Sequence, residues 1–316
     1  MKIGRGVSTR GEQASVIIPA RNEARLLARC LTSVGRQTYP GSLRLIVVAN
    51  ACEDETAHVA RGFEETAKRR EDELIVLETT EAGKPCALNI GDGLVRGGPR
   101  IYLDADVSLS PNAIERLLDA LCPTSGIHVS LPRLCLRRAR SHWSRSYASV
   151  WSALPYVQTT GAGTGVYAVS AVGRERWRSF PPLHSDDKLV CSLFAPAERT
   201  IVADALAEKE VPEGLMRLVS ARARWCRGNR ELARKVPSSR AVDGRRYNGI
   251  VSMLSKRPDL WVHMPSFLFV YATAAAAAGA VQKSRLDQWD TPRDVDPMAP
   301  AASPSLHDEV RSGLNE

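Results

Sequence analysis

Asp104 and Asp106 form an acidic pair, separated by one alanine, directly after the apolar run 101–103. Because side chains alternate along an extended chain, we expect both carboxylates on one side, at the end of a strand. Two carboxylates placed in this way can hold one hard divalent cation and leave coordination positions for phosphate oxygens and water. The alternative for Asp106 is a hydrogen bond into the turn at 108–110.

Four further polar residues could join this acidic pair. Lys84 follows the apolar run 74–77 and can meet a phosphate as a point charge, although an ordinary surface lysine is the alternative. Asp54 follows the run 43–48 and is either a site residue or a helix cap. Asp186 and Asp187 precede a helical run, where a carboxylate can also serve only to stabilise the helix start.

Arg224 and Trp225 place a guanidinium next to an aromatic ring in the segment 221–225, ARARW. A guanidinium is a planar fork of donors that suits the oxygens of a diphosphate. The alternative is a basic, partly buried helix with no ligand.

Short apolar strands alternate with amphipathic helices through the first 120 residues. This alternation is typical of a parallel sheet with helices on both faces. Ligands of such sheets bind beyond the carboxyl ends of the strands, where the candidate residues of the first half lie. The expected strands are 14–18, 43–48, 74–77 and 100–103, and the expected helices are 26–34, 54–69, 84–95 and one that begins at 110–111.

The glycine pattern excludes two common classes of nucleotide-binding enzyme. The first strand–helix turn, 19–23, holds no glycine, whereas a dinucleotide fold needs glycine there so that the backbone can approach the pyrophosphate. The loop 161–165, GAGTG, has a different spacing, and the sequence has no phosphate-binding G-x-x-x-x-G-K-[ST] motif. A nucleotidyltransferase would also show a glycine-rich loop after the first strand.

Positive charge is concentrated in the second half of the chain. The net charge is +8, but the segment 217–257 alone holds twelve Lys and Arg against two acids. A solvated basic face is one interpretation, and attraction to an anionic membrane surface is the other. No nucleic-acid-binding module is recognised, so we expect no nucleic-acid partner.

An uncharged stretch of 23 residues, 260–282, follows this basic segment. As a helix it measures about 34 Å, enough for a hydrocarbon core of about 30 Å. It could span a membrane, lie on one or be a buried core helix, and we expect a membrane-associated or transmembrane helix at 259–285. The last residues, 286–316, are acidic and rich in proline, which predicts a mostly disordered tail.

The N-terminal segment and the cysteines bear on cellular location. Residues 1–13 are polar and charged, so we expect no signal peptide. The seven cysteines are an odd number without a C-x-x-C pair, which favours reduced thiols. Together with the apolar helix, these features predict a protein at the cytoplasmic face of the cell membrane, peripheral or single-pass.

Six segments in this order resemble family 2 glycosyltransferases with the GT-A fold, a Rossmann-type, mostly parallel α/β sheet. The resemblance covers residues 14–231. The segments are SVIIPARNE, LIVVANACEDET, GKPCALNIG, YLDADV, SDD at 185–187 and ARARW at 221–225.

The resemblance implies a role for each matching residue. Asp104 and Asp106 would carry the metal, Mn²⁺ or Mg²⁺, and Asp187 would be the general base, with Asp186 beside it in the catalytic motif. The residues implied to bind the nucleotide sugar are Pro19, Asn22, Glu23, Asn50, Asp54, Lys84, Asp104, Arg224 and Trp225.

Three positions depart from the family pattern. Asn50 stands where an acidic residue is common, which implies altered contacts with the base or the ribose. Asp186 replaces a glutamate with a shorter side chain of the same charge. Ala221 replaces the glutamine of processive polymerising members, which argues for a non-processive enzyme that transfers a single sugar.

We therefore expect metal-dependent, inverting transfer of one sugar, with a UDP-sugar as the favoured donor. Residues 1–125 would bind the nucleotide sugar and residues 126–258 would hold the acceptor, which is a carbohydrate, a lipid-linked sugar or a small molecule. The alternatives are a non-catalytic, membrane-docked protein that binds nucleotide or lipid, and a sugar nucleotidyltransferase.

Overall fold

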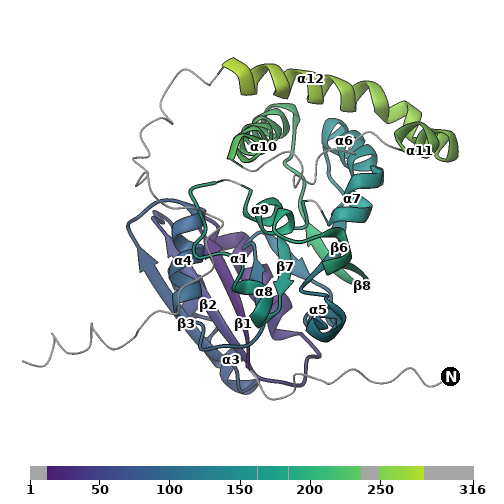
Figure 1. Cartoon of the computed structure of the whole chain (residues 1–316). Coiled ribbons are helices and arrows are strands. Elements are labelled where there is room, and N and C mark those ends of the chain that lie inside the picture. The colour runs from purple at the N-terminus through teal and green to yellow at the C-terminus, as the bar shows by residue number, and fades with distance from the viewer. Residues whose placement is uncertain (1–12, 162, 184, 236–248, 281–316) are drawn as a thin grey trace, which may run out of the picture.

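The computed structural model describes residues 13–280 apart from 162, 184 and 236–248 (Figure 1). The expected acidic tail at 286–316, the end of the expected apolar helix and the segment 1–12 lie outside the described residues. An eight-stranded sheet forms one layer, and a layer of helices lies over one end of it.

The first half of the sheet is parallel, as the sequence predicts. Its strands lie in the spatial order β3-β2-β1-β4, and helices connect them. Every residue of β1 and β2 is buried, which is typical of strands covered on both faces. The bounds are β1 Ala14–Ala20, β2 Leu43–Asn50, β3 Glu73–Thr79 and β4 Arg100–Leu103.

The second half of the sheet is mixed. Strand β7 is antiparallel to β4 and to β6, β6 is parallel to β8, and β5 is antiparallel to β8. Four of the seven pairings are therefore parallel. The bounds are β5 Val107–Leu109, β6 Val129–Leu136, β7 Val166–Val169 and β8 Arg199–Lys209.

Helices cover both faces of the sheet, which confirms the expected α/β class. Along β1, Val16 and Ile18 pack into one hydrophobic core, whereas Ile17 between them packs into the other. The expected helix at 54–69 is divided in two. The bounds are α1 Ala24–Gly35, α2 Thr56–Arg61, α3 Glu64–Arg69, α4 Lys84–Gly93, α5 Ala113–Ala120, α8 Ala171–Arg174 and α9 Asp186–Ser192.

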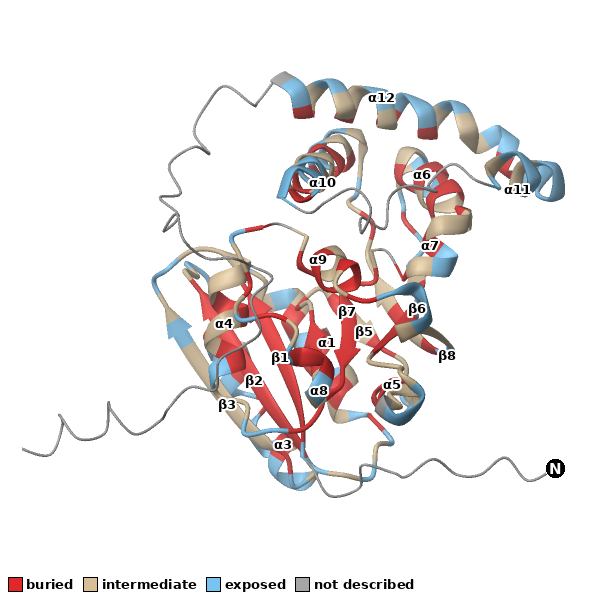
Figure 2. Cartoon of the chain, in the orientation of Figure 1, coloured by how far each residue is buried: buried red, intermediate tan, exposed pale blue. Residues whose placement is uncertain are grey.

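The remaining helices form a separate layer beyond the carboxyl ends of β1–β4 (Figure 1). They share a third core that includes Tyr147 of α6, Leu218 of α10 and Val270 of α12. Figure 2 shows that buried residues face inward in this layer while its outer side is exposed. The bounds are α6 His142–Ala153, α7 Pro155–Thr160, α10 Leu215–Lys235, α11 Ile250–Lys256 and α12 Met264–Ala280.

Helix α12 is the expected C-terminal apolar helix, and it packs along α10 and α6 (Figure 1). Its buried side chains are Phe267, Val270, Ala274 and Ala278, spaced three or four residues apart on one face. Within the described part of the chain, one helical stretch, Pro258–Gly279, is long and apolar enough to cross a membrane. Of an apolar 18-residue segment in this stretch, 22% is buried in the protein.

Candidate active site

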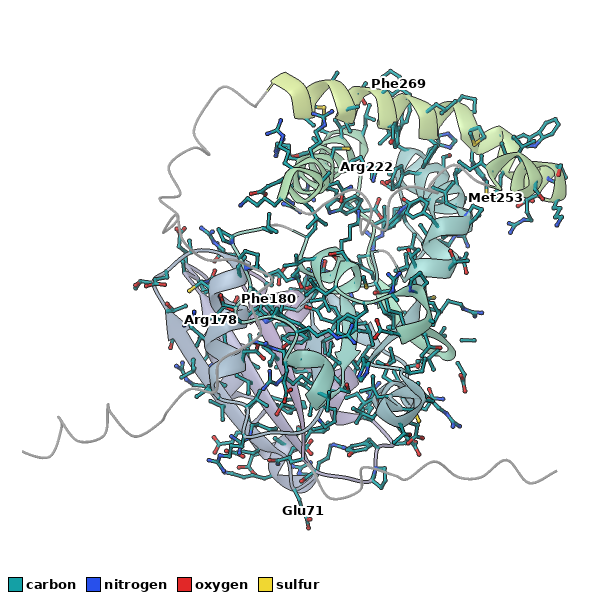
Figure 3. The ribbon with its side chains drawn as sticks, viewed as in Figure 1. Glu71, Arg178, Phe180, Arg222, Met253 and Phe269 are labelled. Atoms are coloured by element: carbon teal, nitrogen blue, oxygen red, sulfur yellow. The ribbon has the colours of Figure 1, made fainter. Side chains whose placement is uncertain are left out.

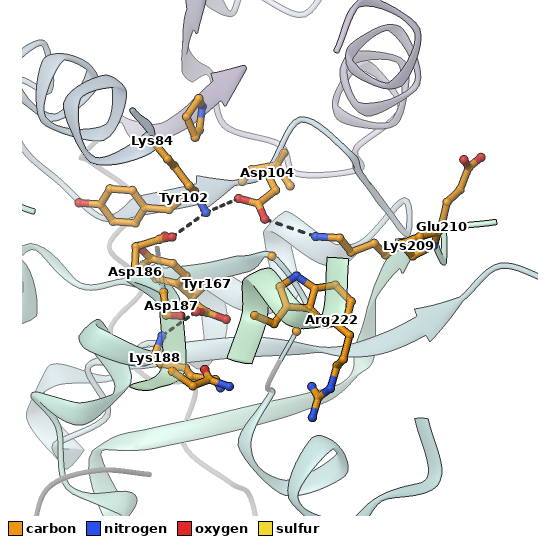
Figure 4. A pocket seen from close by; sticks show the side chains of 18 of the residues that line it. Lys84, Tyr102, Asp104, Tyr167, Asp186, Asp187, Lys188, Lys209, Glu210 and Arg222 are labelled. Atoms are coloured by element: carbon orange, nitrogen blue, oxygen red, sulfur yellow. Dashed lines mark hydrogen bonds and ion pairs between the residues drawn. The ribbon is translucent and has the colours of Figure 1, made fainter. Parts of the chain in front are cut away.

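A pocket with a cavity volume of about 150 Å³ lies between the carboxyl ends of the strands and the helical layer. It holds six of the residues that the sequence predicts, brought from five separate parts of the fold (Figure 4). These six are Pro19, Lys84, Asp104, Asp186, Asp187 and Trp225.

Lys84 pairs with two carboxylates inside this pocket. It is the first residue of α4, directly after Gly83, whose φ of +133° favours glycine. Its Nζ lies 2.6 Å from Asp104 Oδ1 and 2.6 Å from Asp186 Oδ1 (Figure 4). Burial by itself lowers the pKa of Lys84, but the two carboxylates outweigh it and hold the pKa well above its ordinary value. Lys84 is therefore a permanent cation.

Asp104 begins a turn, which corrects the expected extended geometry of the acidic pair. Its carbonyl accepts a hydrogen bond from Val107 N at 3.1 Å, and its N–H donates to Gly165 O at 2.8 Å. Gly165 has a φ of +69°, and a Cβ there would lie 2.6 Å from Asp104 Oδ2. Glycine at this position thus makes room for the carboxylate.

Lys209 brings a second ammonium group to the acidic pair. It is the last residue of β8, and its Nζ lies 3.0 Å from Asp106 Oδ1 and 3.4 Å from Asp104 Oδ2. Burial lowers the pKa of Lys209, and the carboxylates of Asp106 and Asp104 raise it above its ordinary value. Both aspartates therefore direct an oxygen toward one point, although they lie on a turn.

This convergence allows a test of whether the pair suits Mn²⁺ or Mg²⁺. The donors are hard carboxylate oxygens, and Asp106 Oδ1 is buried with no hydrogen bond besides its ion pair with Lys209. The described residues contain no cluster of three or more His, Cys, Asp or Glu side chains that could hold a metal ion by itself. Mg²⁺ sites at phosphates commonly use one or two carboxylates, with phosphate and water supplying the rest. The donor set fits such a cation.

Glu23 adds to the negative potential near the pair without lining the pocket. Burial, and then the charges of Asp106 and Asp104, raise its pKa to about 7, against lowering by Lys209 and Lys84.

Asp186 and Asp187 occupy different environments although they are neighbours at the start of α9. Asp186 is 4% exposed, accepts a hydrogen bond from the Tyr167 hydroxyl at 3.1 Å and pairs with Lys84. Burial raises the pKa of Asp186. Asp187 is only partly buried, lines the pocket and accepts a hydrogen bond from Lys188 N at 2.7 Å. Asp186 is thus fixed by the fold, whereas Asp187 faces pocket space.

Aromatic side chains of the helical layer form another wall of the pocket. The rings of Trp151 from α6 and Trp225 from α10 stack with centroids 5.5 Å apart. Trp151 Nε1 donates to the Tyr156 hydroxyl at 3.2 Å. A Cβ at Gly163 would lie 2.7 Å from the Trp151 ring, so the glycine allows the loop to pass beneath the indole. Stacked, polar-tipped aromatics of this kind suit a sugar face or an apolar chain.

The guanidinium at the pocket belongs to Arg222, whereas Arg224 is exposed on α10 and does not line it. Arg222 is 7% exposed, and its guanidinium carbon lies 4.8 Å from the centroid of the Tyr271 ring of α12 (Figure 3). Its Nε has no hydrogen-bond partner among the described residues. A buried fork donor is therefore present, two positions before the one that the sequence predicts.

Asn22 and Asp54 do not line the pocket but join two strand–helix turns. Asp54 Oδ2 accepts a hydrogen bond from Ala24 N, the first residue of α1, at 3.2 Å, and its Oδ1 accepts one from Thr56 N at 3.0 Å. Asn22 Oδ1 accepts one from Glu53 N at 2.8 Å. Asp54 is therefore not the N-cap residue of α2, which is Glu55, but its carboxylate accepts hydrogen bonds from the first residues of α1 and α2.

Asn50 holds the loop before Lys84. It is 2% exposed, its Oδ1 accepts a hydrogen bond from Gly83 N at 2.8 Å, and its Nδ2 donates to Glu81 O. An aspartate could accept the first bond but could not donate the second. The two hydrogen bonds therefore explain why an amide side chain, and not a carboxylate, occupies position 50.

Tyr102, Tyr167 and Lys209 are among the pocket residues that were not predicted. Tyr102 and Tyr167 stack with centroids 4.9 Å apart on neighbouring strands. No sequence signal indicated Lys209, because no strand was predicted at β8. Only the pairing of β8 with β5 and β6 brings Lys209 to the acidic pair.

A family model, glycosyl transferase family 2, matches residues 15–172, which is half of the chain. The chain belongs to this family. It is 35% identical over 111 residues to glycosyltransferase AglE of Haloferax volcanii, and 38% identical over 95 residues to a PGL/p-HBAD biosynthesis glycosyltransferase of Mycobacterium tuberculosis. These matches cover 35% and 30% of this chain, and each spans 36% of the relative.

Solved structures share the fold. The mannosyltransferase PcManGT of Pyrobaculum calidifontis, in complex with GDP-Man and Mn²⁺, superposes with a TM-score of 0.54 at 22% identity over 90% of this chain and 79% of that one. TarS of S. aureus superposes with a TM-score of 0.50 at 12% identity over 84% of this chain and 55% of TarS. The fold is therefore that of GT-A glycosyltransferases.

Replacement of Asn50 by aspartate tests its structural role. We expect Asn50→Asp to lower the free energy of unfolding by about 1–3 kcal/mol, because the Glu81 carbonyl loses its donor and faces a carboxylate. Urea denaturation measures the change. The matched control is Asn22→Asp, which keeps an acceptor at an exposed site and should change stability by less than about 0.5 kcal/mol. Equal stability of both variants would contradict the assignment.

Proposed function

We propose that the protein transfers one sugar from a nucleotide-diphosphate sugar to an acceptor hydroxyl. The observation that carries the proposal is that Asp104, Lys84 and Asp187 of a family 2 chain line a single pocket. The fold is shared with an enzyme solved with GDP-Man and Mn²⁺, which supports the donor class. A UDP-sugar is the favoured donor.

The nucleotide would lie at the carboxyl ends of β1 and β2, beside Pro19. The joined turns that hold Asn22, Glu23 and Asp54 form the rim there. Asn50 would act on the donor through the loop that it holds. Residues 1–125 would then bind the donor.

Lys84 and Arg222 would hold the diphosphate, and Asp104 and Asp106 would bind Mn²⁺ or Mg²⁺ there. The cation supplies positive charge to the diphosphate as it leaves. Arg222 takes the role first expected for Arg224, because its buried guanidinium lines the pocket and has an unpaired Nε. Fixed donors in a water-poor site stabilise developing charge without reorganisation.

Asp187 would accept the proton of the acceptor hydroxyl as that oxygen attacks the anomeric carbon. In-line attack from the side away from the leaving group inverts the anomeric centre. Asp186 cannot serve in the same way, since it is buried against Tyr167 and neutralised by Lys84. Its role is to position Lys84.

The acceptor would approach from the helical layer, which residues 126–258 largely supply. Trp151, Tyr156 and Trp225 offer faces for a carbohydrate or for a lipid-linked acceptor. Because α12 closes this layer, a lipid-linked acceptor could reach the pocket from a membrane surface.

Helix α12 would hold the protein at the cytoplasmic face of the membrane as a peripheral protein. One of its faces packs on α10 and α6, while Leu268 of α12 is 55% exposed and Val262, in the 3₁₀ turn Pro258–His263 directly before α12, is 71% exposed. A helix held along its length by the domain suits the plane of the interface better than a path across the bilayer. Exposed cations on the helices that contact this region would attract anionic lipids. They are Arg230, Arg234, Lys235, Lys256 and Arg257.

Donor binding is tested by melting the protein with UDP, GDP, dTDP or CDP, each with Mn²⁺ and with EDTA. We expect one nucleotide to stabilise the fold in the presence of Mn²⁺ alone. At a hundred times the dissociation constant the gain is about 2.7 kcal/mol. Absence of a shift with all four nucleotides would contradict the donor site and favour a protein without transferase activity.

The base role is tested by Asp187→Asn. We expect kcat to fall by about 10²–10⁴-fold, because the proton acceptor is lost, with the nucleotide affinity unchanged. The control is Asp204→Asn on the exposed part of β8, which should leave kcat unchanged. Retained activity in Asp187→Asn, or a product that keeps the donor's anomeric configuration, would contradict the assignment.

Membrane docking is tested by flotation with vesicles of phosphatidylglycerol or of phosphatidylcholine alone. We expect binding to the anionic vesicles that weakens at high salt. The double variant Val262→Ser with Leu268→Ser should reduce it at least about tenfold, since each apolar side chain contributes about 1.5–3 kcal/mol when buried. The control is Val172→Ser on α8, also exposed but distant from α12 in the chain. An equal loss in the control, or none in the double variant, would contradict docking through α12.

A further inference from the structure

Two aspartates that line the pocket and Asp106, which does not line it, are connected by two lysines in one row of alternating charges. The order is Asp186, Lys84, Asp104, Lys209, Asp106, and every neighbouring pair is in ion-pair contact. Lys84 joins Asp104 to Asp186, and Lys209 joins Asp104 to Asp106. The two lysines therefore occupy different places, and Lys209 alone lies between the two carboxylates of the acidic pair.

The position of Lys209 Nζ is the one that a cation bound by both aspartates would need. Nζ lies 3.0 Å from Asp106 Oδ1 and 3.4 Å from Asp104 Oδ2. A Mg²⁺-sized cation bound to the same oxygens at about 2.0–2.1 Å leaves no space there for an ammonium group. The two positive charges would also repel each other at this distance. The ammonium group and the metal therefore exclude each other.

Lys209 has the means to leave this position. Its backbone is fixed as the last residue of β8, but its ammonium group is carried on a flexible four-carbon stem. Lys209 lines the same pocket as Lys84 and Arg222, the proposed diphosphate ligands. A nucleotide diphosphate would offer it new anionic partners.

We propose that Lys209 is an internal cation that holds the metal position in the ligand-free protein and couples metal binding to donor binding. Without a nucleotide, a divalent cation has to displace an ammonium group from two carboxylates. With a nucleotide diphosphate, Lys209 moves to the phosphates and the metal binds at the aspartates. The metal and the nucleotide thus raise each other's affinity by the same factor. This inference rests on the proposed function for its ligand.

The test measures Mn²⁺ binding directly, by the loss of the free Mn²⁺ signal in electron paramagnetic resonance, with and without UDP or whichever nucleotide stabilises the protein. We expect Lys209→Met to bind Mn²⁺ at least tenfold more tightly than the unaltered protein in the absence of nucleotide. The dependence of the Mn²⁺ dissociation constant on nucleotide should shrink by the same factor. Lys209→Arg, which keeps the charge, should behave like the unaltered protein.

Two controls separate this effect from a general change of charge or fold. Lys68→Met removes an exposed lysine paired with glutamates of α3, and it should leave Mn²⁺ binding unchanged. If Lys209→Met fails to fold, Lys209→Gln removes the charge and keeps an unbranched stem with a polar end, one atom shorter, and the same gain is expected.

The proposal is overturned if the Mn²⁺ affinity of Lys209→Met equals that of the unaltered protein. It is also overturned if neither protein binds Mn²⁺ with nucleotide present, because Lys209 would then be the permanent cation of the site. Neither result removes the proposed transferase activity, which a sugar-transfer assay reports separately. Loss of nucleotide binding itself would instead contradict the proposed function.

Discussion

The pocket depends on the pairing of buried charges. A carboxylate taken out of water is costly unless a cation and hydrogen bonds replace its hydration, and three aspartates share this region. Lys84 and Lys209 provide the cations, and each comes from the end of a different element. The start of α4, the end of β8, the turn after β4 and the start of α9 must therefore meet at one place. The packing of both halves of the sheet brings these four segments together.

The same pairing distinguishes the two neighbouring aspartates of α9. Asp186 is neutralised by Lys84 and bound by Tyr167, so its carboxylate is part of the framework. Asp187, one residue later, is rotated by about 100° around the helix and faces the pocket instead. Two adjacent residues thus have different environments, which is why the proposed mechanism gives proton transfer to Asp187 and not to Asp186.

The parallel half of the fold was predictable because its strands are continuous apolar runs between amphipathic helices. All four strands occur where the pattern indicates, and Asp104 and Lys84 follow the ends of two of them. The second half was not predictable in this way. Strand β8 carries exposed and buried residues without a clean alternation, so neither the strand nor Lys209 at its end was visible. The choice of Arg222 over Arg224 depends on the rotation of α10, which tertiary packing sets.

Local hydrogen bonding explains one departure from the family pattern. Asn50 both accepts from Gly83 and donates to Glu81, a combination that only an amide side chain offers there. Sequence comparison alone marks this residue as an altered ligand contact. The geometry instead connects it to the loop that presents Lys84.

Apolar C-terminal helices such as α12 are often deleted to make a protein more soluble. Here Phe267 and Val270 belong to the core that also holds Tyr147 and Trp151, and Tyr271 covers the guanidinium of Arg222. A chain shortened before α12 would expose the aromatic wall of the pocket to water and leave a buried arginine without its ring partner. Helix α12 is consequently part of the domain that forms the pocket. Substitutions on its outer face leave that packing intact, whereas deletion of the helix removes it.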